Sequence, residues 1–195
     1  MLVEGQREEA WRQLAQMDIP DHETVTESQN RMTQFLEVTA QHSAYHLEMK
    51  DAYGLDDDYQ VWASGVRFDP AERWPWWIEL VSAAVTRGVA VHRARIVSDP
   101  ISLYVRYEHE LTGGHNIKAG EVVRWLPRRQ ASGLALPGND FWLFDGTSVL
   151  FDHFAGDGTM TGEELVTNPA VVELCDSAFA AVWERAIPHE EYRQI

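Results

Sequence analysis

The chain has 195 residues, of which 45% are hydrophobic, and a formal net charge of −15 at pH 7. The negative charge argues against direct nucleic-acid binding, which needs a positive face, and there is no run of about 18 apolar residues to span a membrane. Because Cys175 is the only cysteine, an internal disulfide and a thiolate metal cluster are excluded within one chain. We interpret Cys175 as a core residue.

The first 25 residues are predicted to form an extension. Residues 4–17 have the apolar spacing of a short amphipathic helix, and the acidic, polar stretch 18–25 follows as a linker. That helix could dock on a partner or fray, and the sequence leaves both open. No secretory signal segment is found at the N-terminus, so we expect a cytoplasmic protein whose single globular domain covers residues 26–195.

A helix and a strand are expected next. The helix, capped by Thr26 or Ser28, runs to about residue 40. Residues 43–51 then alternate apolar side chains with His46, Glu48 and Lys50, which is the period of a half-buried strand. Three adjacent aspartates, 56–58, lack the spacing of a calcium loop and are interpreted as a solvated turn.

Aromatic residues are dense between residues 59 and 77 and indicate a layer over a core edge or a pocket rim. A helix over 75–87, with Gly88 as its left-handed cap, leads into a strand over 89–97. A helix, a glycine and a strand suggest a crossover unit, and hence a partly parallel sheet. The alternation in this strand places Arg93 and Arg95 on the same face.

The remaining elements complete a mixed pattern. A helix over 101–112 is expected to stop at Gly113-Gly114, and a strand over 121–126 to end at Pro127. Residues 140–151 form a hairpin around an Asp-Gly turn, the strongest local signal in the chain. A last helix follows from Pro169 to about residue 186. The fold class predicted is α/β, with α+β as the alternative: a mixed sheet flanked by helices.

Several long motifs carry a resemblance. They are His46-Leu-Glu-x-Lys-Asp-x-Tyr-Gly54, Leu-Pro-Gly-Asn-Asp-Phe-Trp-Leu-Phe-Asp-Gly over 136–146, and Trp-Glu-Arg-Ala-x-Pro-His-x-Glu-Tyr over 183–192. Together they resemble a family of uncharacterised actinobacterial proteins that are often encoded beside small helix-turn-helix regulators. The likeness covers most of residues 28–192. The family has no established activity to carry over, and its context implies a role beside a DNA-binding regulator.

The order of elements is also similar to one half of a phospholipase D-like fold. In that superfamily a nucleophilic histidine and a phosphate-binding lysine form a His-x-Lys motif upstream of an aspartate. Asp145 fits the aspartate, which puts Gly138 in the histidine position and Asp140 in the lysine position. Glycine offers no nucleophile, and aspartate repels phosphate. The resemblance therefore implies a degenerate half-domain that cannot transfer a phosphoryl group.

A candidate cleft can be assembled from polar and aromatic residues near the predicted sheet. Its expected ligand-binding residues are Arg93, Arg95, Trp142, Asp145, Glu48, Arg106, Glu108 and His109, with His153 beside them. Such groups can instead satisfy one another in a buried salt-bridge network, and that alternative stays open. The chain has no His-Glu-x-x-His motif and no Gly-x-Ser-x-Gly elbow, so we expect no metal, cofactor or catalytic residue.

These observations favour a non-enzymatic regulatory or partner-binding protein that acts with a DNA-binding transcriptional regulator without touching DNA. An acidic surface suits a basic protein partner. The alternative is a sensor of a small anionic metabolite in the cleft, because residues 87–129 hold eight Arg or Lys against four Asp or Glu. The sequence does not specify the partner, the ligand or the oligomeric state.

Overall fold

The computed structural model describes residues 25–54 and 57–193, together with Gly5 and Glu9. The predicted extension, a helix over 4–17 and a linker over 18–25, lies outside the described residues except at Gly5, Glu9 and Val25. The extension and the division into domains therefore stay predictions.

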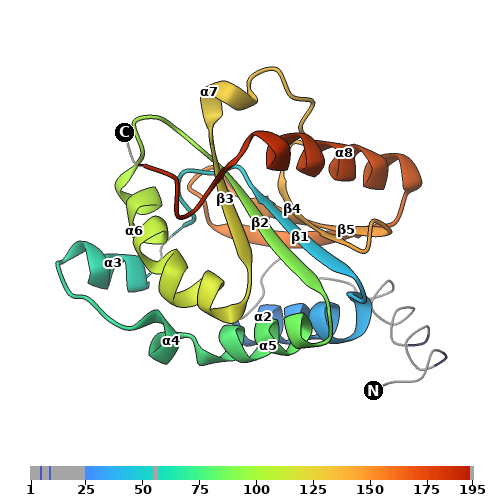
Figure 1. Cartoon of the computed structure of the whole chain (residues 1–195), viewed down its shortest axis with the longest axis horizontal. Coiled ribbons are helices and arrows are strands. Elements are labelled where there is room, and N and C mark those ends of the chain that lie inside the picture. Colours follow the sequence, from blue (N-terminus) through green and yellow to red (C-terminus); the bar gives the residue numbers. More distant parts are fainter. Residues whose placement is uncertain (1–4, 6–8, 10–24, 55–56, 194–195) are drawn as a thin grey trace.

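Strands and helices alternate along most of the described chain (Figure 1). The described strands are β1 (Ser43–Glu48), β2 (Ala90–Val97), β3 (Val122–Pro127), β4 (Asp140–Phe144), β5 (Ser148–Phe154), β6 (Met160–Val166) and β7 (Ile187–Pro188). The described α-helices are α2 (Val25–Gln34), α3 (Asp57–Ala63), α4 (Pro70–Arg73), α5 (Pro75–Thr86), α6 (Leu103–Thr112), α7 (Arg128–Ala131) and α8 (Pro169–Arg185). Two π-helical turns, η1 (Phe35–Thr39) and η2 (Gly113–Ile117), extend α2 and α6.

The strands described form one sheet in the order β6-β5-β4-β1-β2-β3-β7. β1, β2 and β3 are parallel neighbours, and the other pairings are antiparallel. The predicted crossover unit and the mixed sheet flanked by helices are therefore confirmed. The hairpin is confirmed as well, with positive φ angles at Asp145 (50°) and Gly146 (63°) that suit its tight turn.

One face of the sheet is closed by α8 (Figure 1). Asn168 caps this helix by accepting a hydrogen bond from the backbone N–H of Ala170, at 2.9 Å. Its buried side chains pack against apolar side chains of the sheet: Leu47, Ala94, Ile96, Leu126, Phe141, Leu143 and Val149. Cys175 is buried in this layer, as expected for a core thiol. The α8 face of the sheet is thus an ordinary hydrophobic core.

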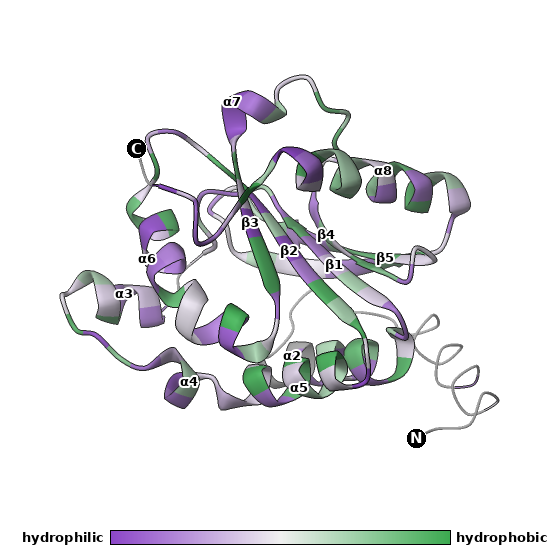
Figure 2. Cartoon of the chain, in the orientation of Figure 1, coloured by the Kyte–Doolittle hydropathy of each residue, from purple (hydrophilic) through white to green (hydrophobic). Residues whose placement is uncertain are grey.

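The opposite face is covered by α2, η1, α5 and α6. Near η1 and α5 it is apolar, with Phe35, Leu36, Val81 and Ala84 packed on the ends of β1, β2 and β4. Further along the same strands the face becomes polar, and Figure 2 shows hydrophilic segments within the central strands. The polar side chains there are buried nonetheless: His46, Glu48, Arg93, Arg95, Asp140 and Asp152. This polar face carries the candidate site.

In four places the elements differ from what the sequence suggested. β1 is not half-buried, because it is a central strand with helices on both sides. The α-helix α6 ends at Thr112 as predicted, but the chain stays helical through Gly113 and Gly114 in η2. A Cβ at Gly114 would lie 2.9 Å from Pro70 Cγ, so glycine permits this close contact with α4. Asp57 and Asp58 begin α3 instead of lying in a turn. The short β7 and the edge strand β6 were not expected.

Candidate functional site

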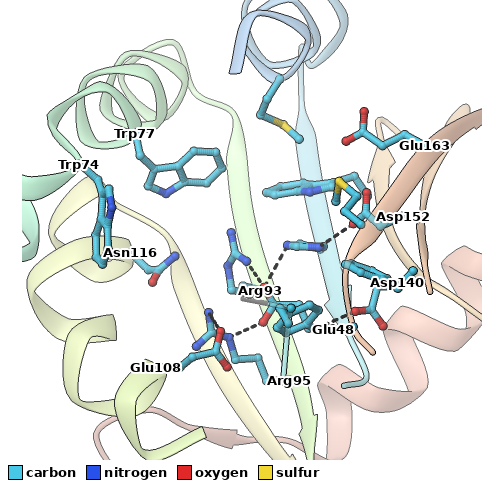
Figure 3. A pocket seen from close by; sticks show the side chains of 18 of the residues that line it. Glu48, Trp74, Trp77, Arg93, Arg95, Glu108, Asn116, Asp140, Asp152 and Glu163 are labelled. Atoms are coloured by element: carbon cyan, nitrogen blue, oxygen red, sulfur yellow. Dashed lines mark hydrogen bonds and ion pairs between the residues drawn. The ribbon is translucent and has the colours of Figure 1, made fainter. Parts of the chain in front are cut away.

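A cavity of about 740 Å³ lies between the polar face of the sheet and helices α5 and α6. Its described lining combines carboxylates, arginines and aromatic rings. The carboxylates are Glu48, Glu108, Asp140, Asp152 and Glu163, and the arginines are Arg93 and Arg95. The aromatic residues are Tyr53, Trp74, Trp76, Trp77, Tyr104, Tyr107, Trp142 and Phe154. In Figure 3, Trp74 and Trp77 lie on one side of the cavity, with Asp152 and Glu163 on the other.

A buried ion-pair network forms the floor of the cavity. Arg93 contacts Glu48 through Nη1 and Glu121 through Nε, the latter at 2.8 Å. Arg95 contacts the second oxygen of Glu48, and its Nη2 lies 3.5 Å from Glu108. Each of the two guanidinium groups therefore faces two carboxylates. Since a buried charge is tolerated only when it is paired, this arrangement explains how two arginines lie inside the fold.

Glu121 anchors the network to the helical layer. Its Oε1 accepts hydrogen bonds from Trp77 Nε1 at 2.6 Å and from Asn116 Nδ2 at 2.9 Å. Burial alone would raise the pKa of Glu48, but Arg95 and Arg93 outweigh burial and lower it to about 2. Glu48 is consequently a permanent anion at neutral pH. The floor of the cavity is a fixed set of charges.

A row of three carboxylates crosses the antiparallel half of the sheet. Asp140 on β4 is the cross-strand partner of Asp152 on β5, which is in turn the partner of Glu163 on β6. Like charges placed directly opposite each other destabilise a sheet unless they are neutralised. Glu163 forms an ion pair with the buried Arg31 of α2. The central member of the row, Asp152, forms no ion pair with an arginine or lysine among the described residues.

Hydrogen bonds hold Asp140 in place. Its two oxygens accept from the backbone N–H of Met49, at 2.8 Å, and from the hydroxyl of Tyr53, at 2.7 Å. Burial nevertheless raises the pKa of Asp140 to about 6. Burial, followed by the charges of Glu163 and Asp140, raises the pKa of Asp152 well above its usual value. Part of the carboxylate row is therefore protonated in mildly acidic solution.

His46 lies between the floor and this row. Its Nδ1 is 3.4 Å from Glu48 and its Nε2 is 3.5 Å from Asp152, and its ring stacks on Trp142 with centroids 4.2 Å apart. Burial and the charge of Arg93 keep the pKa of His46 well below its usual value, so the ring is neutral. The ring therefore separates the Glu48 carboxylate of the floor from the Asp152 carboxylate of the row without adding a positive charge between them.

A comparison with protein families places the chain. The family described as "Domain of unknown function (DUF6879)" matches residues 30–194. The chain belongs to the DUF6879 family. None of the curated proteins matches this DUF6879 domain.

Among solved structures, the DUF6879 domain is similar to a phospholipase D family member, Nuc from Salmonella typhimurium, with a TM-score of 0.47 and 11% sequence identity. The alignment covers 83% of this chain and 88% of that one. This agrees with the distant likeness expected from the order of elements, and it carries nothing over to the chemistry of the cavity.

Five of the eight predicted cleft residues line the cavity: Glu48, Arg93, Arg95, Glu108 and Trp142. The two arginines share a face, as the alternation predicted, and both contact predicted carboxylates. The two arginines lie in a buried salt-bridge network, which was one of the two alternatives left open by the sequence. A cavity also lies beside this network, as the cleft hypothesis predicted. That these residues bind a ligand stays a prediction.

The placement of Asp145 in the cleft was wrong. Its carboxylate accepts hydrogen bonds from the backbone N–H groups of Gln41, His42 and Ser43, at 2.7–2.8 Å. It therefore fastens the β4–β5 turn to the start of β1, away from the cavity lining. Asp140, at the start of β4, is the aspartate of this strand that reaches the cavity.

Three other predictions for the cleft were also wrong. Arg106 is exposed on the solvent stripe of α6, which also carries Leu103 and Glu110. His109 turns toward β3 and the C-terminal segment, where it stacks on His189 with centroids 4.6 Å apart. His153 alternates with Asp152 on β5 and so points to the other side, 3.3 Å from Glu164.

The sequence reading missed His46, Asp140, Asp152 and Glu163 as site residues. The alternation had already put His46 beside Glu48 on one side of β1, which was the available signal. Asp152 and Glu163 become neighbours only through the β5–β6 pairing, and β6 was not expected. In the described residues, no group of three or more His, Cys, Asp or Glu is arranged to hold a metal ion. No described helix combines the length and apolar character required to cross a membrane.

Proposed function

We propose that this DUF6879 domain binds a small molecule in the cavity and serves as a ligand-sensing module. The observation that carries the proposal is the cavity itself. Its volume of about 740 Å³ lies within the range of roughly 300–1,000 Å³ typical of small-ligand sites. Its lining joins a large aromatic surface to a few converging polar groups, which is the usual composition of such sites.

The way the polar groups are held supports the same proposal. Glu48, Arg93, Asp140 and Asp152 project from strands rather than loops, and sites on regular elements keep their geometry best. Burying so many charged groups costs stability relative to an apolar core of the same shape. The α8 face of the same strands shows that this sheet can be closed by apolar packing alone. A polar, hollow face therefore points to a role other than stability.

A thermal-shift screen of common metabolites tests the proposal. Trp76 lines the cavity and is half-buried, so Trp76→Ala removes lining surface. The matched control is Trp183→Ala, because Trp183 is half-buried on α8 at the other face, where it stacks on His92. A ligand at 100 times its Kd adds about 2.7 kcal/mol of stability. In a domain of this size that raises Tm by roughly 5–10 °C.

We expect at least one compound to raise the Tm of the wild type and of Trp183→Ala, and to act much less on Trp76→Ala. The proposed function is wrong if no compound in a broad screen raises the Tm of the wild type or of Trp183→Ala. It is also wrong if every compound that raises the Tm acts equally on Trp76→Ala and Trp183→Ala.

A regulatory role with a protein partner is the second candidate, and the net charge of −15 is the observation that favours it. A chain of this charge attracts a basic protein surface and repels the phosphates of DNA. We propose that an actinobacterial helix-turn-helix regulator is such a partner. A gel shift at physiological salt should show no sequence-specific retention of duplex DNA by the purified chain. Tight, sequence-dependent retention of DNA would exclude a role in which the chain acts only through a protein partner.

A further inference from the structure

We propose that the ligand of this cavity is an organic cation, an amine joined to an apolar or aromatic group, whose positive charge is held by Asp152. The inference rests on the proposed function and names the chemical class of the ligand. It follows from three features of the cavity: an excess of carboxylates over cations, one carboxylate that lacks a cationic partner, and an aromatic wall across from it.

The first feature is the charge of the lining. Five carboxylates and two guanidinium groups line the cavity. Both arginines are already engaged with carboxylates of the floor, since Arg93 contacts Glu48 and Glu121, and Arg95 contacts Glu48. An anionic ligand would have to displace one of these buried ion pairs. A cationic ligand displaces none of them, so the charges favour a cation.

The second feature is the position of Asp152. It is 6% exposed and lies in register between Asp140 and Glu163, so its charge is opposed by a carboxylate on either side. Glu163 forms an ion pair with Arg31, and Asp140 accepts hydrogen bonds from the Tyr53 hydroxyl and the Met49 backbone N–H. In the described part of the chain, the Asp152 carboxylate has one side-chain partner within ion-pair range, Nε2 of the neutral His46, at 3.5 Å. A ligand ammonium would supply the missing counter-charge.

The third feature is the wall opposite this carboxylate. Trp74 and Trp77 lie across the cavity from Asp152 in Figure 3. Trp76, whose ring packs edge-on against Trp77, also lines the cavity. Aromatic faces attract cations and bury apolar groups, so this wall suits the organic part of an amine as well as its charge. Arg93 already uses the faces of Trp77 and Trp142 in this way, with distances of 5.7 and 5.4 Å to the ring centroids.

Three probes that share an indole ring separate charge from shape: tryptamine is a cation, tryptophol is neutral and indole-3-propionate is an anion. Their binding at neutral pH can be followed by two-dimensional NMR of the isotope-labelled protein, in which the tryptophan indole N–H signals report on the cavity. We expect tryptamine to bind at least tenfold more tightly than tryptophol, and indole-3-propionate to bind most weakly.

The decisive variant is Asp152→Asn, which removes the charge and keeps the shape. It should weaken tryptamine binding at least tenfold and leave tryptophol binding within about twofold, where a tenfold change corresponds to about 1.4 kcal/mol. The control is Asp176→Asn, an exposed position on α8 that removes the same unit of charge from the chain. It should change tryptamine binding less than about twofold, which excludes a general attraction of cations to an acidic protein.

Several results would overturn the inference. These are equal or tighter binding of tryptophol or indole-3-propionate, tryptamine binding that is unaffected by Asp152→Asn, and no response to tryptamine at millimolar concentration. Stabilisation by Mg²⁺ or Ca²⁺ alone that disappears in Asp152→Asn would also overturn it, in favour of an inorganic ion. In each case, metabolites whose effect depends on Trp76 would still support the proposed function, so the two failures can be told apart.

Discussion

The two faces of the sheet use the same strands for different purposes. On β1, Leu47 points to α8 and is sealed in an apolar layer, whereas Glu48, the next residue, points to the cavity and is sealed in an ion-pair network. On β2, Ala94 and Arg95 divide in the same way. The apolar packing on the α8 face stabilises the domain, whereas the buried charges of the polar face lower its stability unless each one is paired. This difference is the basis for proposing that the polar face binds the ligand.

The largest expected effect comes from breaking the polar network. Arg93→Met removes a cation that faces two buried carboxylates, Glu48 and Glu121, and leaves both without it. We expect the free energy of unfolding in urea to fall by about 3–5 kcal/mol, the usual cost of removing one partner of a buried ion pair. A loss below about 1 kcal/mol would mean that water reaches these carboxylates and that the floor is not a closed network.

The α8 face should respond differently to a core deletion. Leu143 is fully buried there, so Leu143→Ala should lower the free energy of unfolding by about 2–5 kcal/mol through cavity formation. It should nevertheless leave the affinity of any compound found in the screen unchanged within about twofold, measured by calorimetry below the Tm. A large change in affinity would show that the two faces are coupled and would remove the distinction between them.

Two aspartate substitutions should shift stability in opposite directions at neutral pH. Asp145→Asn weakens a carboxylate that accepts three backbone hydrogen bonds, so it should destabilise the fold by about 1.5–3 kcal/mol. Asp152→Asn removes a buried charge with like charges beside it, so it should stabilise the fold. This gain follows from the raised pKa of the Asp152 carboxylate, because burial and the neighbouring carboxylates disfavour its charged form. Chemical denaturation of both variants checks the signs, and two changes of the same sign would contradict the account.

The smallest effect is the pH dependence of that gain. Because the fold raises the pKa of Asp152, its contribution to stability is present at low pH and is lost as pH rises from about 4 through the folded pKa. The advantage of Asp152→Asn should therefore vanish near pH 4 and grow as pH rises. The charged and titratable groups facing Asp152 are Asp140, Glu163, Glu48, Arg93 and His46. They are common to both proteins, so the difference between the two unfolding curves isolates Asp152. A gain that does not depend on pH would refute this origin.

Local sequence patterns predicted the parts of this molecule that depend on local chemistry. The helix ending at Gly88 and the strand after it implied a parallel crossover, and strand alternation put Arg93 and Arg95 on one face with carboxylates to answer them. The Asp-Gly turn was equally clear. In each case the residues that decide the structure are close together in the chain.

The errors arose where distant segments meet. Asp145 reaches back to Gln41, His42 and Ser43, more than one hundred residues away, so its role could not be inferred from the turn that contains it. Asp152 becomes a site residue only because β5 pairs with both β4 and β6. Alternation could assign a face to His46, but it could not show that both faces of β1 are covered.

Hydrogen–deuterium exchange of the wild-type protein, with and without the best-stabilising compound from the screen, tests most directly whether the polar face is the functional one. We expect slower exchange in segments that line the cavity, namely the start of α5, the cavity side of α6 and residues 158–163 of the β5–β6 turn and β6. Exchange in α8, residues 169–185, should be unchanged. Protection centred on α8, or protection spread evenly over both faces of the sheet, would contradict the assignment of the cavity as the binding site.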